Sequence, residues 1–188
     1  MSYIFLIIAF ILLLIGISAV LSLMMIRIPP IPSSPSVIKA IINEIQKTPH
    51  SCNITELGSG YGYMLFRLAK AFPQRQIIGI EISFIPFFFS SVIRILGRYK
   101  NVRIFYGNAF TVIEKKSLPV DIAVGYLIAT QKISDNLEKL YREKISELLI
   151  LNTYPLKNIT ATQTIPKLDI FKSTLYLYHK NQNIGESK

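Results

Sequence analysis

The segment Glu56–Gly62, ELGSGYG, constrains the fold more than any other part of this sequence. It overlaps the end of an apolar, β-prone run at Cys52–Leu57 and precedes a helical pattern at Tyr63–Ala71. Glycine reaches positive φ angles at little steric cost and has no Cβ, so the backbone can turn sharply and a ligand can approach it closely. A strand, a glycine-rich turn and a helix in this order predict the first unit of a nucleotide-binding sheet.

Apolar, β-prone runs alternate with helical patterns along the rest of the chain. A helix is expected to open at Ser34, a favourable N-cap, with Pro35 at its first position. The later predicted elements are strands at Gln76–Glu81, Val102–Tyr106, Val120–Tyr126 and Glu147–Asn152, helices at Pro86–Arg98 and Ser134–Ile145, a short segment at Phe110–Lys115, and an antiparallel pair at Ile159–Thr164 and Ser173–Tyr178. This alternation predicts an α/β fold with a Rossmann-like, doubly wound, mostly parallel sheet and a C-terminal antiparallel hairpin.

An uncharged stretch of 24 residues, Tyr3–Ile26, precedes these elements. As a helix it would span about 36 Å, enough to cross a hydrocarbon core of about 30 Å. No basic residue precedes it and its apolar core is longer than that of a signal peptide, so we predict one uncleaved transmembrane helix. Arg27, Lys39 and Lys47 follow it, and the positive-inside rule then places the domain in the cytoplasm of a single-pass membrane protein.

These patterns give a predicted domain organisation. We expect a transmembrane anchor at residues 1–27, a proline-rich spacer at 28–36, one folded domain at 37–182 and a polar tail at 183–188. Four prolines in the spacer favour an extended, semi-rigid conformation. A chain of 188 residues can bury one core of this size, but hardly two.

The net charge of +10 indicates an anionic partner. The cations are spread out, with only Lys115 and Lys116 adjacent, so an acidic lipid bilayer fits better than nucleic acid and we predict no nucleic-acid partner. One cysteine, Cys52, and two histidines without metal-ligand spacing predict no metal site.

The glycine spacing narrows the class of ligand. The order is G-x-G-x-G, and Tyr63 stands where a dinucleotide fingerprint requires its third glycine, which disfavours NAD and FAD. Glu81 ends the second predicted strand, where a carboxylate can accept hydrogen bonds from both hydroxyls of a ribose. The pattern is compatible with a nucleoside ligand that lacks a pyrophosphate and places a small amino-acid end against the turn.

Over residues 29–180 the sequence resembles the class I S-adenosylmethionine-dependent methyltransferases. ELGSGYG is similar to their first motif, and GIEIS at Gly79–Ser83 is similar to their ribose-binding second strand. The resemblance implies S-adenosylmethionine as the cofactor, with the glycines along its methionine end, Glu81 at the ribose and Asn108 beside the adenine. The implied cofactor-binding residues are Glu56, Gly58, Ser59, Gly60, Tyr61, Gly62, Glu81, Ile82, Asn108 and Ala109.

A narrower resemblance is to small membrane-anchored protein-lysine methyltransferases, which modify the ATP synthase c subunit or the adenine nucleotide translocase, and to their bacterial relatives. It rests on IPSSPSVIKAI, VRIFYGNAF, DIAVGYL and LNTYP, and it implies a lysine of a membrane protein as the methyl acceptor. Ala129 stands where proline is expected, and Lys157-Asn158 replace an expected glycine-tryptophan pair. Two alternatives stay open: a lipid or quinone acceptor, and a non-catalytic assembly factor that binds S-adenosylmethionine.

Strand ends of open α/β sheets face the ligand crevice, which identifies candidate catalytic residues. Tyr126 ends the fourth predicted strand, and Asn152 and Tyr154 follow the fifth. Methyl transfer is an in-line displacement that depends chiefly on alignment, so no dedicated triad is required. For Tyr126, half-buried packing is the alternative interpretation.

For two helical segments we expect a structural role. For the phenylalanine-rich segment Phe84–Ile95 we favour packing on the sheet with the aromatic rings in the core, and contact with a membrane interface is the alternative. We expect Asn136–Lys144, NLEKLYREK, to be a solvated face with ion pairs at helical spacing.

Overall fold

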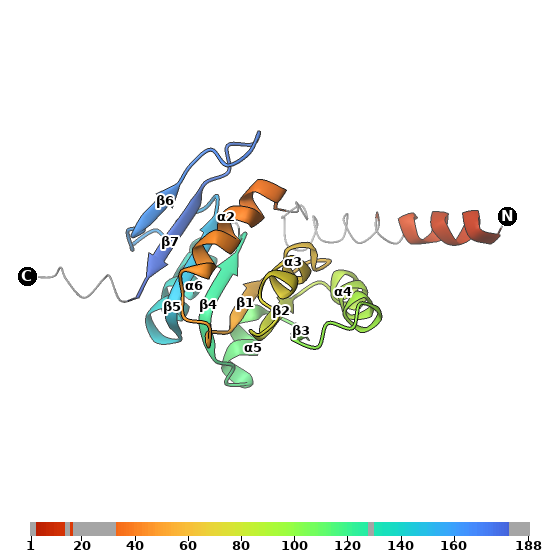
Figure 1. The fold of residues 1–188 in the computed structure, drawn as a ribbon, viewed down its shortest axis with the longest axis horizontal. Helices are drawn as coiled ribbons and strands as arrows, with labels where there is room; N and C mark the ends of the chain where they lie inside the picture. The colour runs from red at the N-terminus through yellow and green to blue at the C-terminus, as the bar shows by residue number, and fades with distance from the viewer. Residues whose placement is uncertain (1–2, 14–15, 17–32, 128–129, 181–188) are drawn as a thin grey trace, which may run out of the picture.

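The predicted alternation of strands and helices is present in the computed structural model of the chain, which describes residues 3–13, 16, 33–127 and 130–180 (Figure 1). The elements of the domain are α2 (Pro35–Gln46), β1 (Ile54–Leu57), α3 (Tyr63–Ala71), β2 (Ile77–Glu81), α4 (Phe84–Leu96), β3 (Val102–Tyr106), α5 (Ala109–Lys115), β4 (Val120–Gly125), α6 (Gln131–Glu143), β5 (Ile145–Asn152), β6 (Gln163–Ile165) and β7 (Leu175–His179). Ser34 caps α2 through its side chain, which accepts from the Val37 N–H, as its position before Pro35 predicts.

The strands form one seven-stranded sheet in the order β3-β2-β1-β4-β5-β7-β6. The first five strands of this order pair in parallel, while β7 is antiparallel to both β5 and β6. The sheet is therefore Rossmann-like and mostly parallel, with the antiparallel C-terminal pair that the sequence predicts. The strand order reverses between β1 and β4, and ligands of such sheets bind at the carboxyl ends of the strands beside this reversal.

Helices cover both faces of the sheet (Figure 1). α2 and α3 pack on one face through Val37, Ile41 and Leu65, and α5 and α6 pack on the other through Ile113 and Leu140. All four residues of β1 are buried, as the central strand of a sheet covered on both sides requires. This packing fixes the strands whose ends carry the predicted site.

The phenylalanine-rich helix α4 differs from our expectation. Only Pro86 and Ser90 of this helix are buried, whereas Phe84 and Phe88 are 61% and 52% exposed. The phenylalanine rings pack mainly on one another and on Tyr106, at 5.9 Å between the ring centroids of Phe84 and Tyr106. The expectation of core aromatic residues was wrong because α4 lies against β2 and β3, at the edge of the sheet, where few side chains are available to cover it.

The predicted membrane location is also contradicted. Within the parts of the chain that the structure describes, no helix has both the length and the apolar character to cross a membrane. Residues 3–13 are helical with exposed side chains, while residues 14–15 and 17–26 of the predicted span lie outside the described residues. The same holds for residues 28–32 of the predicted spacer and for the predicted tail at 183–188. The expectation of a single-pass protein with a cytoplasmic domain and a bilayer partner is therefore corrected.

A polar bridge joins three strands at the end of the sheet opposite the predicted site. The Asn53 backbone N–H and Nδ2 both donate to Asp121 Oδ2, at 2.9 and 2.7 Å, and the Asp121 N–H donates back to Asn53 Oδ1 at 3.2 Å. The Ser146 hydroxyl donates to the other carboxylate oxygen of Asp121 at 2.8 Å. Asp121 thus ties the start of β1 and of β5 to β4.

Asp121→Ala should lower the free energy of unfolding by about 1–3 kcal/mol, because it leaves partly buried donors without their acceptor. Urea unfolding followed by circular dichroism measures this loss. Asp135→Ala is the control, since the exposed carboxylate of Asp135 accepts one side-chain hydrogen bond, from Gln131, and its removal should change the stability by less than about 0.5 kcal/mol. Equal losses in the two variants would contradict the bridging role of Asp121.

Candidate functional site

The glycine-rich turn after β1 has the backbone that only glycine adopts readily. Gly58, Gly60 and Gly62 have φ angles of +77°, +54° and +84°. A Cβ on Gly60 would meet no atom within 4 Å, whereas a Cβ on Gly62 would lie 2.4 Å from the Phe66 ring. Gly60 therefore faces open space in which a ligand can lie against the backbone, and Gly62 is required for packing at the start of α3.

Glu81, at the end of β2, holds this turn in place. Its carboxylate accepts from the Gly60 N–H at 2.7 Å through Oε2 and from the Ser83 N–H at 2.7 Å through Oε1. The side chain is buried, and two backbone donors to an anion form strong hydrogen bonds. A carboxylate has further lone pairs, so Glu81 can fix the turn and still accept from a ligand hydroxyl.

Glu56, the third residue of β1, is a buried carboxyl beside the same turn. Its side chain is 5% exposed, and its Oε2 atom has no hydrogen-bond partner among the described residues. Burial, together with the negative charge of Glu81, raises the pKa of Glu56 well above its usual value. A buried carboxyl without a partner is costly unless it stays protonated or meets a cation, so this atom is available to a cationic ligand group.

The remaining predicted cofactor residues lie at the ends of β1, β2 and β3. Ser59 is buried with an unpartnered hydroxyl among the described residues, and Tyr61 packs on Phe89 with 6.2 Å between ring centroids. Ile82 is exposed directly after Glu81. Asn108 caps α5, accepting from the Phe110 and Thr111 N–H groups, and Ala109 is the first residue of that helix. The structure thus brings the ten predicted residues to the carboxyl ends of three neighbouring strands.

The three predicted catalytic residues lie beyond the strand reversal, at the ends of β4 and β5. The rings of Tyr126 and Tyr154 lie 6.2 Å apart at an angle of 31°. Burial raises the pKa of Tyr126, with smaller contributions in the same direction from Tyr154 and Asp169. Asn152 is buried, and its Oδ1 accepts from the Thr153 hydroxyl at 3.1 Å. The two tyrosines therefore form a half-buried aromatic pair, and the charge of Asp169 acts on Tyr126.

Asp169 was not among the predicted residues. It lies in the loop between β6 and β7, where its carboxylate accepts from the Phe171 and Ser173 N–H groups at 3.1 and 3.0 Å and from the Ser173 hydroxyl at 2.9 Å. These hydrogen bonds, the Ser173 N–H first, lower the pKa of Asp169 and keep it anionic. No local sequence signal places residue 169 near strand β4, so sequence reasoning could not find it.

Hydrogen bonds join the loop after β5 to α6. Glu138 Oε1 accepts from the Asn158 N–H at 2.9 Å, and Asn158 Nδ2 donates to the same carboxylate. Lys157 Nζ donates to Gln131 Oε1 at 2.5 Å. The Tyr178 hydroxyl accepts from the Leu156 N–H at 2.8 Å, which fixes the start of the loop on β7.

The contact of Glu138 with Asn158 corrects the expectation that Asn136–Lys144 is a solvated face. Glu138 is 8% exposed, and it lies with Ser134, Leu137 and Tyr141 on the buried side of α6. The single ion pair within 4 Å among the described residues joins Lys47 to Glu44, far from this segment in the sequence. The spacing 134, 137, 138, 141 is that of a helix face turned to the core, and this signal in the sequence could have identified Glu138 as buried.

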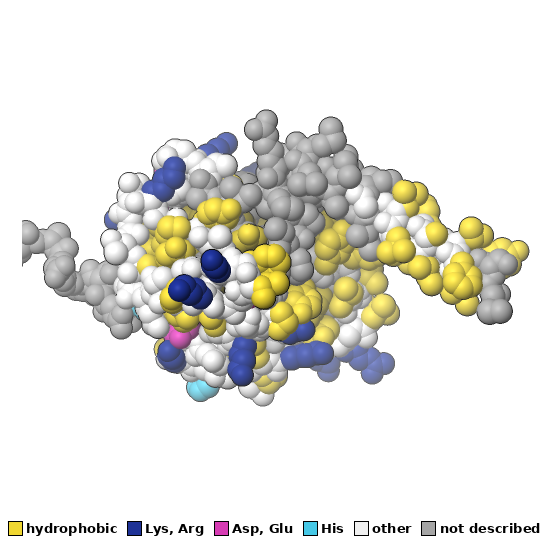
Figure 2. All heavy atoms as spheres, turned by 90° about the horizontal axis from the view of Figure 1, so that it is seen from above, with side chains coloured by type: hydrophobic (Ala, Val, Ile, Leu, Met, Phe, Trp, Pro, Cys, Tyr) yellow, Lys and Arg dark blue, Asp and Glu magenta, His cyan; other side chains and the backbone are white. Residues whose placement is uncertain are grey.

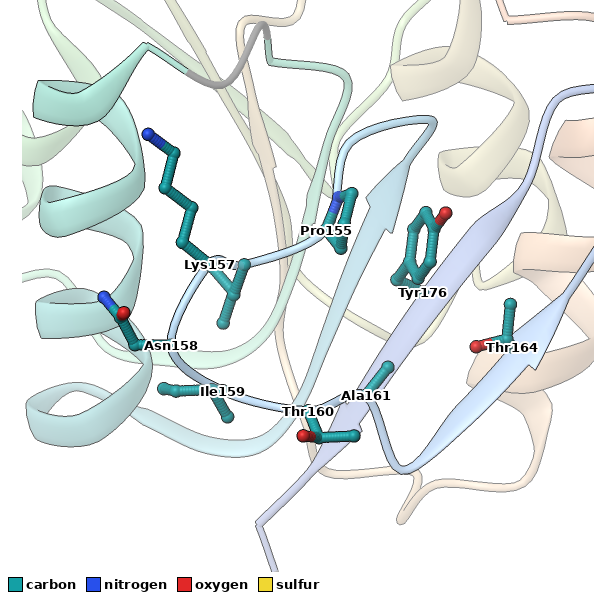
Figure 3. A pocket seen from close by; sticks show the side chains of 9 residues that line it. Pro155, Lys157, Asn158, Ile159, Thr160, Ala161, Thr164 and Tyr176 are labelled. Atoms are coloured by element: carbon teal, nitrogen blue, oxygen red, sulfur yellow. The ribbon is translucent and has the colours of Figure 1, made fainter.

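The loop after β5 borders a cavity of about 400 Å³ that is open to solvent (Figure 3). Its lining consists of residues 155–161 together with Thr164 of β6 and Tyr176 of β7. The first residue of the lining, Pro155, directly follows Tyr154 in the sequence. Within the described residues, no group of three or more histidine, cysteine or acidic side chains is placed to hold a metal ion.

Comparisons with known proteins agree with this geometry. A protein family described as "Putative methyltransferase" matches residues 50–126, which run from just before β1 to just after β4. No curated protein matches the chain.

Solved structures share most of the fold. An RNA methyltransferase from Salinibacter ruber in complex with S-adenosyl-L-homocysteine has a TM-score of 0.65 at 19% identity, over 84% of this chain and 98% of that chain. A precorrin-6y C5,15-methyltransferase from Geobacter metallireducens has a TM-score of 0.57 at 12% identity, over 80% and 90% of the two chains. PKMT2 from Rickettsia typhi in complex with AdoHcy has a TM-score of 0.52 at 14% identity, over 67% and 26%.

The chain has a class I methyltransferase fold. The family match and the neighbours with bound S-adenosylhomocysteine support S-adenosylmethionine as the cofactor. The structural neighbours include methyltransferases of RNA and of a small molecule, which does not fit the expected membrane-protein acceptor.

Proposed function

We propose that this chain is an S-adenosylmethionine-dependent methyltransferase that methylates the ε-amino group of a lysine in a protein. The observation that carries the proposal is one arrangement at the carboxyl edge of the sheet. A glycine turn with a free face and two buried carboxyls ends β1 and β2. An aromatic pair follows β4 and β5, and the charge of Asp169 acts on Tyr126 of this pair.

The residues present suit the cofactor. The open face of Gly60 accommodates its methionine end, and the unpartnered Oε2 of Glu56 suits the ammonium group there. Glu81 suits the ribose hydroxyls, and the exposed Ile82 with Asn108 and Ala109 suits the adenine. S-adenosylmethionine, when bound, supplies a methyl group on a positively charged sulfur.

Tyr126, Tyr154 and Asp169 suit an amine acceptor. A lysine ammonium is attracted to aromatic faces, and the anionic Asp169 adds to this attraction. The lysine must lose a proton to water before its nitrogen lone pair attacks the methyl carbon. Desolvation against the two rings promotes this loss, while the charge of Asp169 opposes it. The new N–C bond forms as the C–S bond breaks, and the electron pair of that bond stays on sulfur. Holding the amine in line with the methyl is the main work of the site.

RNA is the second candidate acceptor, favoured by the net charge of +10. In Figure 2, lysine and arginine side chains are scattered over the visible face and acidic side chains are scarce on it. The RNA methyltransferase among the structural neighbours shares almost its whole length with this fold. Nitrogen atoms of bases are chemically similar acceptors.

Two measurements test the proposal. Calorimetry with S-adenosylmethionine and with NAD tests the cofactor, and binding of NAD alone would refute it. Tritiated S-adenosylmethionine with a lysine-containing peptide and with a uridine-, adenosine- and cytidine-containing oligonucleotide tests the acceptor. Label on the peptide that is lost when its lysines are replaced with arginine supports the lysine acceptor, and label only on the oligonucleotide refutes it.

Tyr126→Ala should lower kcat/KM for the peptide about tenfold, because one of the two rings that attract and desolvate the amine is removed. Tyr126→Phe is the matched control, since it keeps the ring and loses only the hydroxyl. It should retain most of the activity. Initial rates with labelled cofactor measure both variants, and equal losses in the two would show that the hydroxyl, and not the ring, is what the reaction uses.

A further inference from the structure

The cavity under the loop after β5 has no assigned role. Figure 3 shows it between loop residues Pro155, Ile159 and Ala161 on one side and Thr164 and Tyr176 of the two last strands on the other. Tyr176 pairs with Leu151, the last residue but one of β5, so the cavity reaches the edge of the sheet where the acceptor residues lie.

The wall of this cavity is built by specific contacts. Glu138 accepts from the main chain and the side chain of Asn158, and Gln131 accepts from Lys157. Lys157 and Asn158 are two of the three positions where the sequence departs from the narrower family resemblance. In this chain, both residues form hydrogen bonds that join the loop to α6.

The lining favours one class of ligand. Thr160, Thr164 and Tyr176 bring three hydroxyls to the lining, and each can both donate and accept. The lining includes no carboxylate, and its one cation, Lys157, already donates to Gln131. Pro155, Ile159 and Ala161 add apolar surface.

A polypeptide main chain suits a lining of hydroxyls and apolar side chains, because it alternates N–H donors and C=O acceptors and carries apolar side chains. A nucleic-acid backbone fits less well, because the lining offers one cation, Lys157, to a row of phosphates. The volume of about 400 Å³ lies within the usual range of ligand pockets.

We propose that this cavity binds the polypeptide segment next to the acceptor lysine, with main-chain hydrogen bonds to Thr164 and Tyr176 and an apolar side chain against Pro155 and Ile159. The proposal rests on the proposed function, because it assigns the segment to the same acceptor. Binding of this segment makes the enzyme selective for a lysine within a polypeptide over lysine as a free amino acid.

The test compares two probes on the full chain: a capped peptide with a lysine between two leucines, and a single lysine capped at both ends. Thr164→Val combined with Tyr176→Phe removes two hydroxyls with little change of shape. The matched control combines Thr111→Val with Tyr99→Phe, which removes the same atoms away from the cavity. Fluorescence anisotropy measures binding of the labelled peptide in the presence of S-adenosylhomocysteine, and labelled S-adenosylmethionine gives KM for both probes.

We expect the cavity variant to weaken peptide binding about tenfold and to raise the ratio of the peptide KM to the capped-lysine KM by the same factor. The control variant should bind the peptide as the unaltered chain does. Equal peptide binding in the two variants would overturn the proposal, and so would a loss of affinity for a uridylate oligonucleotide without a loss for the peptide. If peptide binding responds as expected but neither probe is methylated, the proposed function fails while the binding site stands.

Discussion

Gly60→Val is expected to weaken S-adenosylmethionine binding by about 100-fold or more. The Cβ position of Gly60 faces open space at a φ of +54°, on the side where the cofactor is proposed to lie. A valine there occupies the ligand's space, and its branched side chain also strains a left-handed backbone by about 1–3 kcal/mol. Glu81 would still hold the Gly60 N–H, so the turn has little freedom to move aside.

Gly60→Asn separates the two causes of this loss. Asparagine tolerates the left-handed region better than other residues with a Cβ, but it fills the same space. Calorimetry should therefore show a comparable loss of cofactor affinity for both variants, and thermal unfolding should show a smaller loss of stability for Gly60→Asn. Near-normal affinity in the asparagine variant would mean that strain, and not occupied space, prevents binding, and the cofactor would then lie elsewhere.

Glu56→Gln should weaken S-adenosylmethionine binding about tenfold or more at neutral pH and remove a pH dependence of stability. The Glu56 carboxyl is buried beside Glu81 with one oxygen unpartnered among the described residues. A cofactor ammonium at this oxygen would favour its charged form, and a glutamine cannot supply that charge.

The direction of the pH effect follows from the raised pKa of Glu56 in the folded protein. Below the pKa of the unfolded state, about 4.3, the group is protonated in both states. As pH rises above that value the unfolded chain ionises first, so the folded state holds more protons and the free energy of unfolding falls until pH passes the folded pKa. The glutamine variant lacks this decline.

Urea unfolding at several pH values between about 5 and 8 should therefore show a steeper loss of stability for the unaltered chain than for Glu56→Gln. Binding of the ammonium should release a proton from Glu56. Calorimetry in two buffers of different ionisation enthalpy would detect this release in the unaltered chain, and its affinity should rise with pH. Parallel stability curves, or equal proton release by the variant, would contradict the assigned environment of Glu56.

The sequence predicts the sheet well because its signals are local. Alternating apolar runs identify six of the seven strands to within about two residues, with Val102–Tyr106 matching β3 at both ends. The exception is β6, because the predicted strand Ile159–Thr164 begins four residues before the observed start at Gln163. The antiparallel pair of β6 and β7 also follows from pattern alone. The bounds of α6 are less accurate, because its start at Gln131 is set by the cap that Thr130 provides and not by hydrophobic spacing.

The candidate site is only partly predictable. The glycine turn and Glu81 stand out because their spacing along the chain is fixed by one strand-turn-helix unit. The contact of Glu138 with Asn158 joins residues that are 20 apart through a loop, and the charge of Asp169 acts on Tyr126 from another loop. Neither of these two interactions has a periodic signal in the sequence. The exposure of α4 was missed for a similar reason, since its position at the edge of the sheet depends on strand order.

The reversal of strand order between β1 and β4 also divides the sequence. Every residue proposed for the cofactor lies between Glu56 and Ala109, and every residue proposed for the acceptor lies between Tyr126 and Tyr176. The family match to residues 50–126 spans the first group and ends where the second begins. Because no residue belongs to both groups, a substitution on the acceptor side need not change any contact to the cofactor.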